Sequence, residues 1–95
     1  MEKKKAYQQK AQAKLAEKRA DIDKVKAKAK GASADAKIEA SKAVDELESK
    51  YQVAKKKLDL LVDAGEDAWE DIAKGFDNAW DDVSGAVKKV FARLS

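Results

Sequence analysis

The chain has 95 residues, of which 41% are charged and only 6% aromatic, so it can build one domain with a thin, linear core. Proline is absent, and the mixture of alanine, lysine and acidic residues indicates long helices and almost no candidate strands. Without cysteine or histidine the chain lacks a thiol nucleophile, a thiolate metal site and the commonest general base. We therefore expect a protein that is not an enzyme and that binds no metal or cofactor.

Residues 1–62 are expected to form a lysine- and alanine-rich helical arm. Lys18 falls in the middle of its apolar stripe, and we interpret it as a side chain whose stem packs while its amine reaches water. The charged start of the chain is not followed by a long apolar segment, so we expect a soluble, cytoplasmic protein. The stripe consists of Tyr7, Ala11, Leu15, Ile22 and Val25.

The arm has a candidate break at residues 31–34. Gly31 is a poor helix former, and either Ser33 or Asp35 can cap a helix that follows it. A turn at this point would divide the arm into two helices of similar length.

A stronger candidate break lies at residues 63–66, where Gly65 can end one helix and acidic residues can begin another. The segment 63–95 is therefore expected to contain one amphipathic helix over about 66–94. Its charges suit a helix dipole, with acidic residues near the start and basic residues near the end. They are Glu66, Asp67, Glu70 and Asp71 at the start and Lys88, Lys89 and Arg93 at the end.

An eleven-residue repeat is the most distinctive pattern of the chain. Trp69 and Trp80 lie in the near-copies Asp67-Ala-Trp-Glu-Asp-Ile72 and Asn78-Ala-Trp-Asp-Asp-Val83, and Phe91 follows after the same interval. Eleven residues make three helical turns, so the repeat returns each residue type to one face of a helix. The repeat passes Gly65 without slipping, which a single uninterrupted helix would explain. Its earlier members are Leu58, Leu47, Ala36 and Val25, accompanied by Leu61, Ile72, Val83 and Leu94 and by Ala43, Ala54, Gly65, Phe76 and Val87.

These patterns predict an all-α fold of long amphipathic helices that form a helical hairpin or a coiled-coil assembly. A three-helix bundle and one continuous helix are the two alternatives. Because an alanine-faced arm covers large side chains only in part, we expect the C-terminal stripe to drive self-association. The predicted self-association interface consists of Leu58, Leu61, Trp69, Ile72, Phe76, Trp80, Val83, Val87, Phe91 and Leu94.

Charge is distributed unevenly along the chain. Residues 1–30 carry eleven basic and four acidic side chains, residues 31–61 carry six of each, and residues 62–95 carry four basic and eight acidic ones, giving +7, 0 and −4. Such opposite ends favour an antiparallel or staggered arrangement. If its symmetry does not close, staggered addition of further copies produces a filament.

Three other patterns have both a functional and a structural interpretation. The aromatic stripe suits a membrane interface or a helix partner, and packing on helices is favoured because its helix is net acidic. Gly75 and Gly85 indicate close approach of a second helix. The acidic residues lack the spacing of a calcium loop, which favours a solvated face. These residues are Glu66, Asp67, Glu70, Asp71, Asp77, Asp81 and Asp82.

The lysines of residues 24–42 have the texture of a nucleic-acid-coating tail. No aromatic side chains are interleaved with them, and the acidic C-terminal third would compete with phosphate for them, so nucleic acid is not an expected partner. A solubilising helix surface is the favoured interpretation. These lysines are Lys24, Lys26, Lys28, Lys30, Lys37 and Lys42.

Residues 66–91, with Glu66-Asp-Ala-Trp-Glu-Asp-Ile72, Gly75 and Ala79-Trp-Asp-Asp-Val83, resemble the C-terminal signature of short bacterial coiled-coil stress-type proteins. The segments Ala20-Asp-Ile-Asp-Lys-Val25 and Ala34-Asp-Ala-Lys-Ile38 are also similar to that family. The lysine-rich, eleven-residue texture is in turn similar to that of late-embryogenesis-abundant proteins. The resemblance implies long amphipathic helices and protection of proteins or membranes during desiccation and related stress, and it implies no catalytic set. The chain departs from the family pattern at Lys18 and Gly31.

The function predicted from the sequence is that of a non-enzymatic, self-assembling helical protein, either stress-protective or a structural scaffold, including a filament. Its expected partner is itself, with a membrane surface or client proteins as further candidates and no small-molecule substrate. The alternative is a peripheral binder of membrane or lipid surfaces that folds on contact. The two functions differ in whether the aromatic stripe is already buried without lipid.

Overall fold

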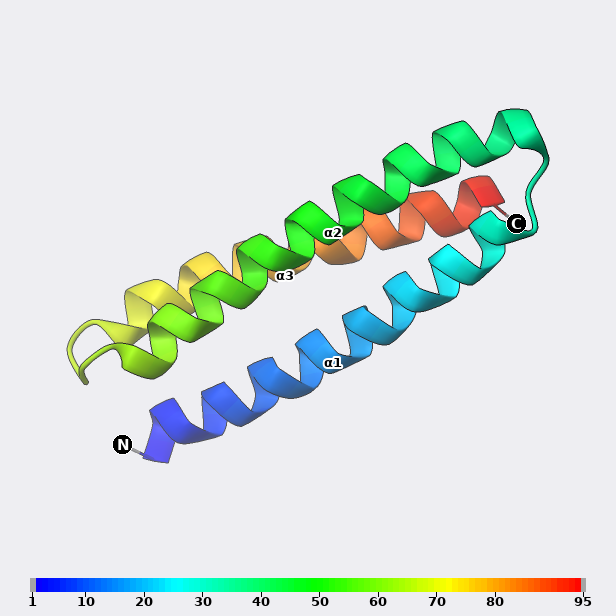
Figure 1. Cartoon of the computed structure of the whole chain (residues 1–95). Helices are drawn as coiled ribbons and strands as arrows, with labels where there is room; N and C mark the ends of the chain where they lie inside the picture. The colour runs from blue at the N-terminus through cyan, green and yellow to red at the C-terminus, as the bar shows by residue number, and fades with distance from the viewer. Residues whose placement is uncertain (1, 95) are drawn as a thin grey trace.

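The protein folds into three helices joined by two short turns, and each helix runs antiparallel to the one before it. This is seen in a computed structural model that describes residues 2–94. The helices are α1 (Glu2–Lys30), α2 (Ala34–Asp63) and α3 (Trp69–Leu94). Each helix packs on the other two, and the bundle measures 50 × 17 × 16 Å (Figure 1). The predicted all-α class is confirmed, in its three-helix form. The arm expected over residues 1–62 is divided at its candidate break, and the chain is not one continuous helix.

The first turn, at residues 31–33, is defined by a serine cap. Ser33 has an extended backbone, with φ −63° and ψ 163°, and its Oγ accepts a hydrogen bond from the amide of Ala36 at 3.4 Å. This bond satisfies one of the amides left unpaired at a helix start. Of the two predicted caps, Ser33 is therefore the one used, and Asp35 lies in the first turn of α2.

The second turn, at residues 64–68, is longer than predicted. Ala64 ends α2 with an extended backbone, and its amide donates to the carbonyl of Leu61 at 3.2 Å. Gly65 has a negative φ, so the turn does not use the left-handed conformation that glycine alone adopts easily. Because Glu66 and Asp67 lie in this turn, α3 begins at Trp69 instead of residue 66.

The core is one apolar cluster along the whole bundle axis. Leu47, Leu61 and Phe76 are fully buried on α2 and α3, while Ile22 and Val25 are fully buried on α1. The eleven-residue stripe thus supplies much of the core. Two of its members are exposed, namely Ala36 near the start of α2 and Gly65 in the second turn.

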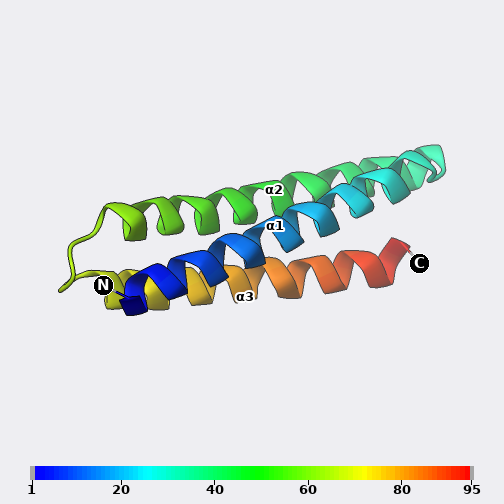
Figure 2. The same cartoon turned by 90° about the horizontal axis from the view of Figure 1, so that it is seen from below.

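The helix α1 lies along both of its neighbours, as Figures 1 and 2 together show. Lys18 lies in its packed stripe, and the side chain of Lys18 is only 12% exposed. The amine pairs with Asp21 at 3.3 Å and lies 5.2 Å from the ring centre of Trp80. The stem of Lys18 therefore packs in the stripe as predicted, and its amine contacts a neighbouring carboxylate and an aromatic ring.

Candidate interaction surface

The ten residues of the predicted self-association interface lie mostly inside the chain's own bundle. Leu58, Leu61, Phe76, Val83 and Val87 are buried. The more peripheral members pack against the same core and are partly buried, namely Trp69, Ile72, Trp80 and Phe91. The side chain of Leu94 lies outside the described part of the chain. An intact bundle must consequently use other residues to meet a second copy, and self-association itself stays a prediction.

Tyr7 joins α1 to the start of α3. Its ring lies 6.0 Å from that of Trp69 and 6.2 Å from that of Phe76, the second contact being edge-on at 84°. Its hydroxyl donates to the carbonyl oxygen of Ala73 at 2.9 Å and to Asp77. Burial and this bond to a carboxylate both raise the pKa of Tyr7, so the hydroxyl is held as a donor.

Lysines of α1 cover the outer parts of the aromatic stripe. Lys14 and Lys18 place their amines 4.7 and 5.2 Å from the ring centre of Trp80, and Lys28 lies 5.2 Å from that of Phe91. A cation over an aromatic face is attracted by the negative potential of the ring. The basic α1 is thus the helix that covers the aromatic edge of α3.

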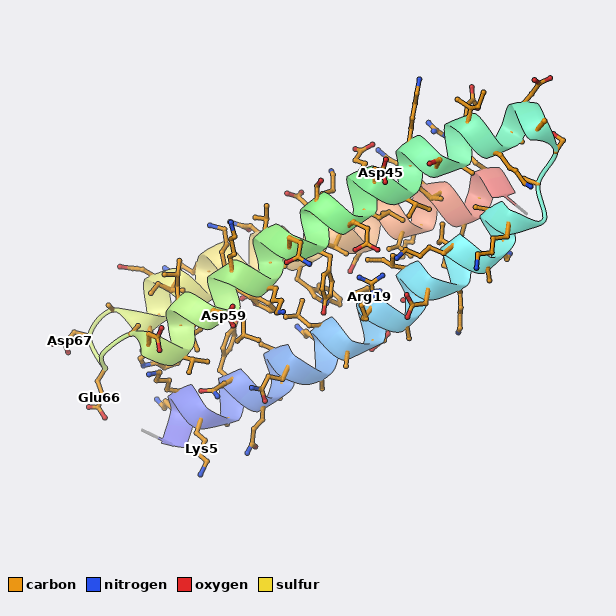
Figure 3. All side chains as sticks on the ribbon, in the orientation of Figure 1. Lys5, Arg19, Asp45, Asp59, Glu66 and Asp67 are labelled. Atoms are coloured by element: carbon orange, nitrogen blue, oxygen red, sulfur yellow. The ribbon has the colours of Figure 1, made fainter. Side chains whose placement is uncertain are left out.

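A charged cluster joins the middle of α1 to α2. Both terminal nitrogens of Arg19 donate to the two oxygens of Glu48 at 2.8 Å, and Lys26 pairs with the same carboxylate at 2.5 Å (Figure 3). The hydrogen bond from Arg19, followed by that from Lys26, lowers the pKa of Glu48 to about 2. The bond to Glu48 likewise raises the pKa of Arg19. This cluster fixes the register of α1 on α2.

The outside of α2 carries a second set of aliphatic residues, the outer apolar line of Ile38, Val53 and Leu60. Their exposed fractions are 62%, 49% and 60%. They are separated by fifteen and seven residues, close to four and two helical turns, so they lie along one side of the helix. Together with Val62, they are all the exposed large apolar side chains of the described chain, and all four are on α2.

A groove of about 800 Å³ runs between α2 and α3, where its α2 side extends from Glu39 to Lys50. Small or short side chains form its floor, including Ala43, Ala86 and Val90, and Gly85 lies at its edge. Among the described residues no ion pair joins its two walls. The walls carry Glu39, Lys42, Glu46 and Lys50 on α2 and Asp81, Asp82, Lys89 and Arg93 on α3.

The two glycines of α3 do not mark a close approach of helices, contrary to the sequence prediction. A Cβ placed on Gly85 would meet nothing within 4 Å. At Gly75 the nearest atoms belong to the flexible side chain of Lys57, at 3.5 Å and beyond, which is ordinary contact.

The remaining charged residues form no evident chemical site. No group of three or more acidic side chains in the described chain is arranged to hold a metal ion. Glu66 and Asp67 project from the second turn (Figure 3). Of the lysines singled out in residues 24–42, Lys26, Lys30 and Lys37 line a shallow hollow between α1 and α2, where Glu48 neutralises Lys26.

Sequence reasoning missed the role of Lys4. Its amine donates to the carbonyls of Val62 and Ala64, 3.1 and 2.5 Å away, at the end of α2. The last turn of α2 has no basic residue of its own, so a lysine from the start of α1 satisfies these carbonyls. The signal available in the sequence was that the last turn of α2 carries no basic residue.

Comparison of the chain with protein-family models, with curated proteins and with solved structures gave no match. No helix within residues 2–94 is both long enough and apolar enough to cross a membrane.

Proposed function

We propose that this protein is a non-enzymatic helical module that associates with itself and serves as a structural scaffold. The observation that carries the proposal is the outer apolar line on α2. The bundle core is already filled by the opposite side of the same helix, so these three exposed aliphatic side chains do not contribute to it. Covering them with a second copy would remove their apolar surface from water.

Covering this line contributes a modest free energy to association. Ile38, Val53 and Leu60 are each about half to two-thirds exposed, and covering what remains contributes roughly 1 kcal/mol per side chain. Two copies contribute two such sets. A stress-protective role, which the family resemblance implies, would use the same surface to cover apolar patches on client proteins.

The arrangement of the aromatic stripe supports this function over a membrane binder that folds on contact. Trp69 and Trp80 pack against the bundle core, and Tyr7, Lys14 and Lys18 of α1 cover them. A surface binder would have to open the bundle before these rings reached lipid. The exposed apolar line on α2 has no aromatic side chain, whereas interfacial helices commonly carry one.

The proposal is tested by making the outer apolar line polar. The triple variant Ile38→Gln, Val53→Gln, Leu60→Gln removes the exposed aliphatics without touching the core. We expect sedimentation equilibrium to show a parent chain that associates with rising concentration and a variant that stays monomeric at every concentration. Circular dichroism should show equal helix content, because glutamine is a good helix former.

The matched control is Lys55→Gln with Asp59→Gln, two exposed positions on another side of α2 whose combined replacement leaves the net charge unchanged. This control should associate like the parent. A parent that is monomeric throughout, or a triple variant that associates as well as the parent, contradicts the proposal.

A further inference from the structure

We infer that the groove between α2 and α3 is where a second copy of the chain binds, antiparallel to the first, to form a closed dimer. This inference rests on the proposed self-association and specifies its surface and symmetry. It is carried by the distribution of charge along the groove, together with the positions of Ile38 and Val53 on α2.

The net charge of the groove changes sign from one end to the other. Its end near the first turn carries Lys42, Lys89 and Arg93 with one acid, Glu39, so its net charge is +2. The other end carries Asp81 and Asp82 with one base, Lys50, so its net charge is −1, and Glu46 lies near the middle of the groove. A partner with the reverse order of charge would complement both ends, and a second copy turned end for end has that order.

A two-fold axis perpendicular to the helices produces this reversal. It places α2 of one copy over α2 of the other and α3 over α3, with both pairs antiparallel. In such an interface, residue i of one copy meets residue j of the other, and j of the first meets i of the second.

One position of the axis allows both an apolar and a charged pairing between the two copies. Pairing Ile38 with Val53 of the second copy puts the axis between residues 45 and 46, and pairing Asp81 with Arg93 puts it at Val87. Lys57 contacts Gly75 across the antiparallel helices, so twelve residues along each helix from that contact reach Asp45 and Val87. The two positions therefore lie at one level of the bundle.

Because this interface uses the same surface on both copies, association stops at two chains. The dimer has the groove floor, with Ala43 and Ala86, in its centre, and the charged walls surround it. The filament considered from the sequence would need a second, different surface.

A charge swap within one chain tests the inference. Asp81 and Arg93 are twelve residues apart on α3, about 18 Å along the axis, so they do not meet within a chain. Asp81→Arg or Arg93→Asp alone places like charges together twice in each dimer, and we expect sedimentation equilibrium to show a dissociation constant raised about tenfold. The double variant restores opposite charges at both contacts and should return to within about threefold of the parent.

Lys74→Asp is the matched control, because it reverses an exposed charge on α3 that lies outside the groove and thirteen residues from the axis at Val87. It should leave the dissociation constant unchanged, and circular dichroism should show all variants folded. A parent that is monomeric at every concentration overturns the proposed self-association and this inference together. A parent that dimerises while the double variant stays as weak as the single ones, or that grows beyond two copies, overturns only the groove and its two-fold pairing.

Discussion

Individual polar side chains hold the three helices in register, and each acts between elements that are distant in sequence. Lys4 satisfies the end of α2, Tyr7 joins α1 to α3, and Arg19 grips Glu48 with both of its terminal nitrogens. None of these pairs could be predicted from spacing, because the partners lie between 29 and 70 residues apart in the sequence. A helical pattern identifies which side of a helix is apolar, but not which charge on the next helix faces it.

Glu48→Gln should lower the free energy of unfolding by about 1–2 kcal/mol at pH 7, because the amide cannot replace two charged contacts on a partly exposed carboxylate. The pKa of Glu48 is about 2 when folded and about 4.5 when unfolded, so its contribution is present above pH 4.5 and is lost as the pH falls toward 2. Urea denaturation at pH 7, 4 and 2 should therefore show the difference between variant and parent shrinking.

The control for this prediction is Asp45→Asn, which changes an exposed carboxylate on the same helix. It should alter the free energy of unfolding by less than about 0.5 kcal/mol at pH 7. A Glu48→Gln variant whose destabilisation is the same at pH 2 and pH 7 would show that the lost contacts are not charge-dependent.

At the scale of the helices, the eleven-residue repeat predicted the buried sides of α2 and α3 well. Leu47, Leu58, Phe76 and Val87 are all buried, as the repeat requires. The repeat failed to reveal the turn at Gly65. Because α2 and α3 face the same core, the apolar positions continue at the same eleven-residue spacing on both sides of the turn. The interface assigned to a second chain was thus largely the contact of the chain with itself, and the groove was not visible in the pattern.

Gly75→Ala should stabilise α3 by about 0.5–1 kcal/mol, since alanine is the better helix former and its methyl group meets only the movable side chain of Lys57. Thermal unfolding at low concentration should show a melting temperature several degrees higher. Gly85→Ala, which meets no atom, should give a similar gain. Loss of stability at Gly75 with a gain at Gly85 would show that the space beside Lys57 is too tight.

At the scale of the whole molecule, the bundle makes the aromatic stripe an internal feature before any partner arrives. Tyr7 and the lysines of α1 cover Trp69 and Trp80, so one helix decides whether these rings are accessible. The tryptophan emission of dilute protein should be blue-shifted in buffer and unmoved by anionic vesicles. Red emission that turns blue only with vesicles would contradict the covered stripe and favour the membrane alternative.

The odd number of helices also has a mechanical consequence. An odd set of antiparallel helices starts and finishes at opposite ends of the bundle, and residues 2 and 94 are placed in this way (Figure 1). Tension applied through these two residues would run along the 50 Å axis, so α1 and α3 would be pulled past each other in shear. All the contacts of the long core would then bear load together instead of opening one at a time. The topology therefore resists tension that is applied between the two ends of the bundle.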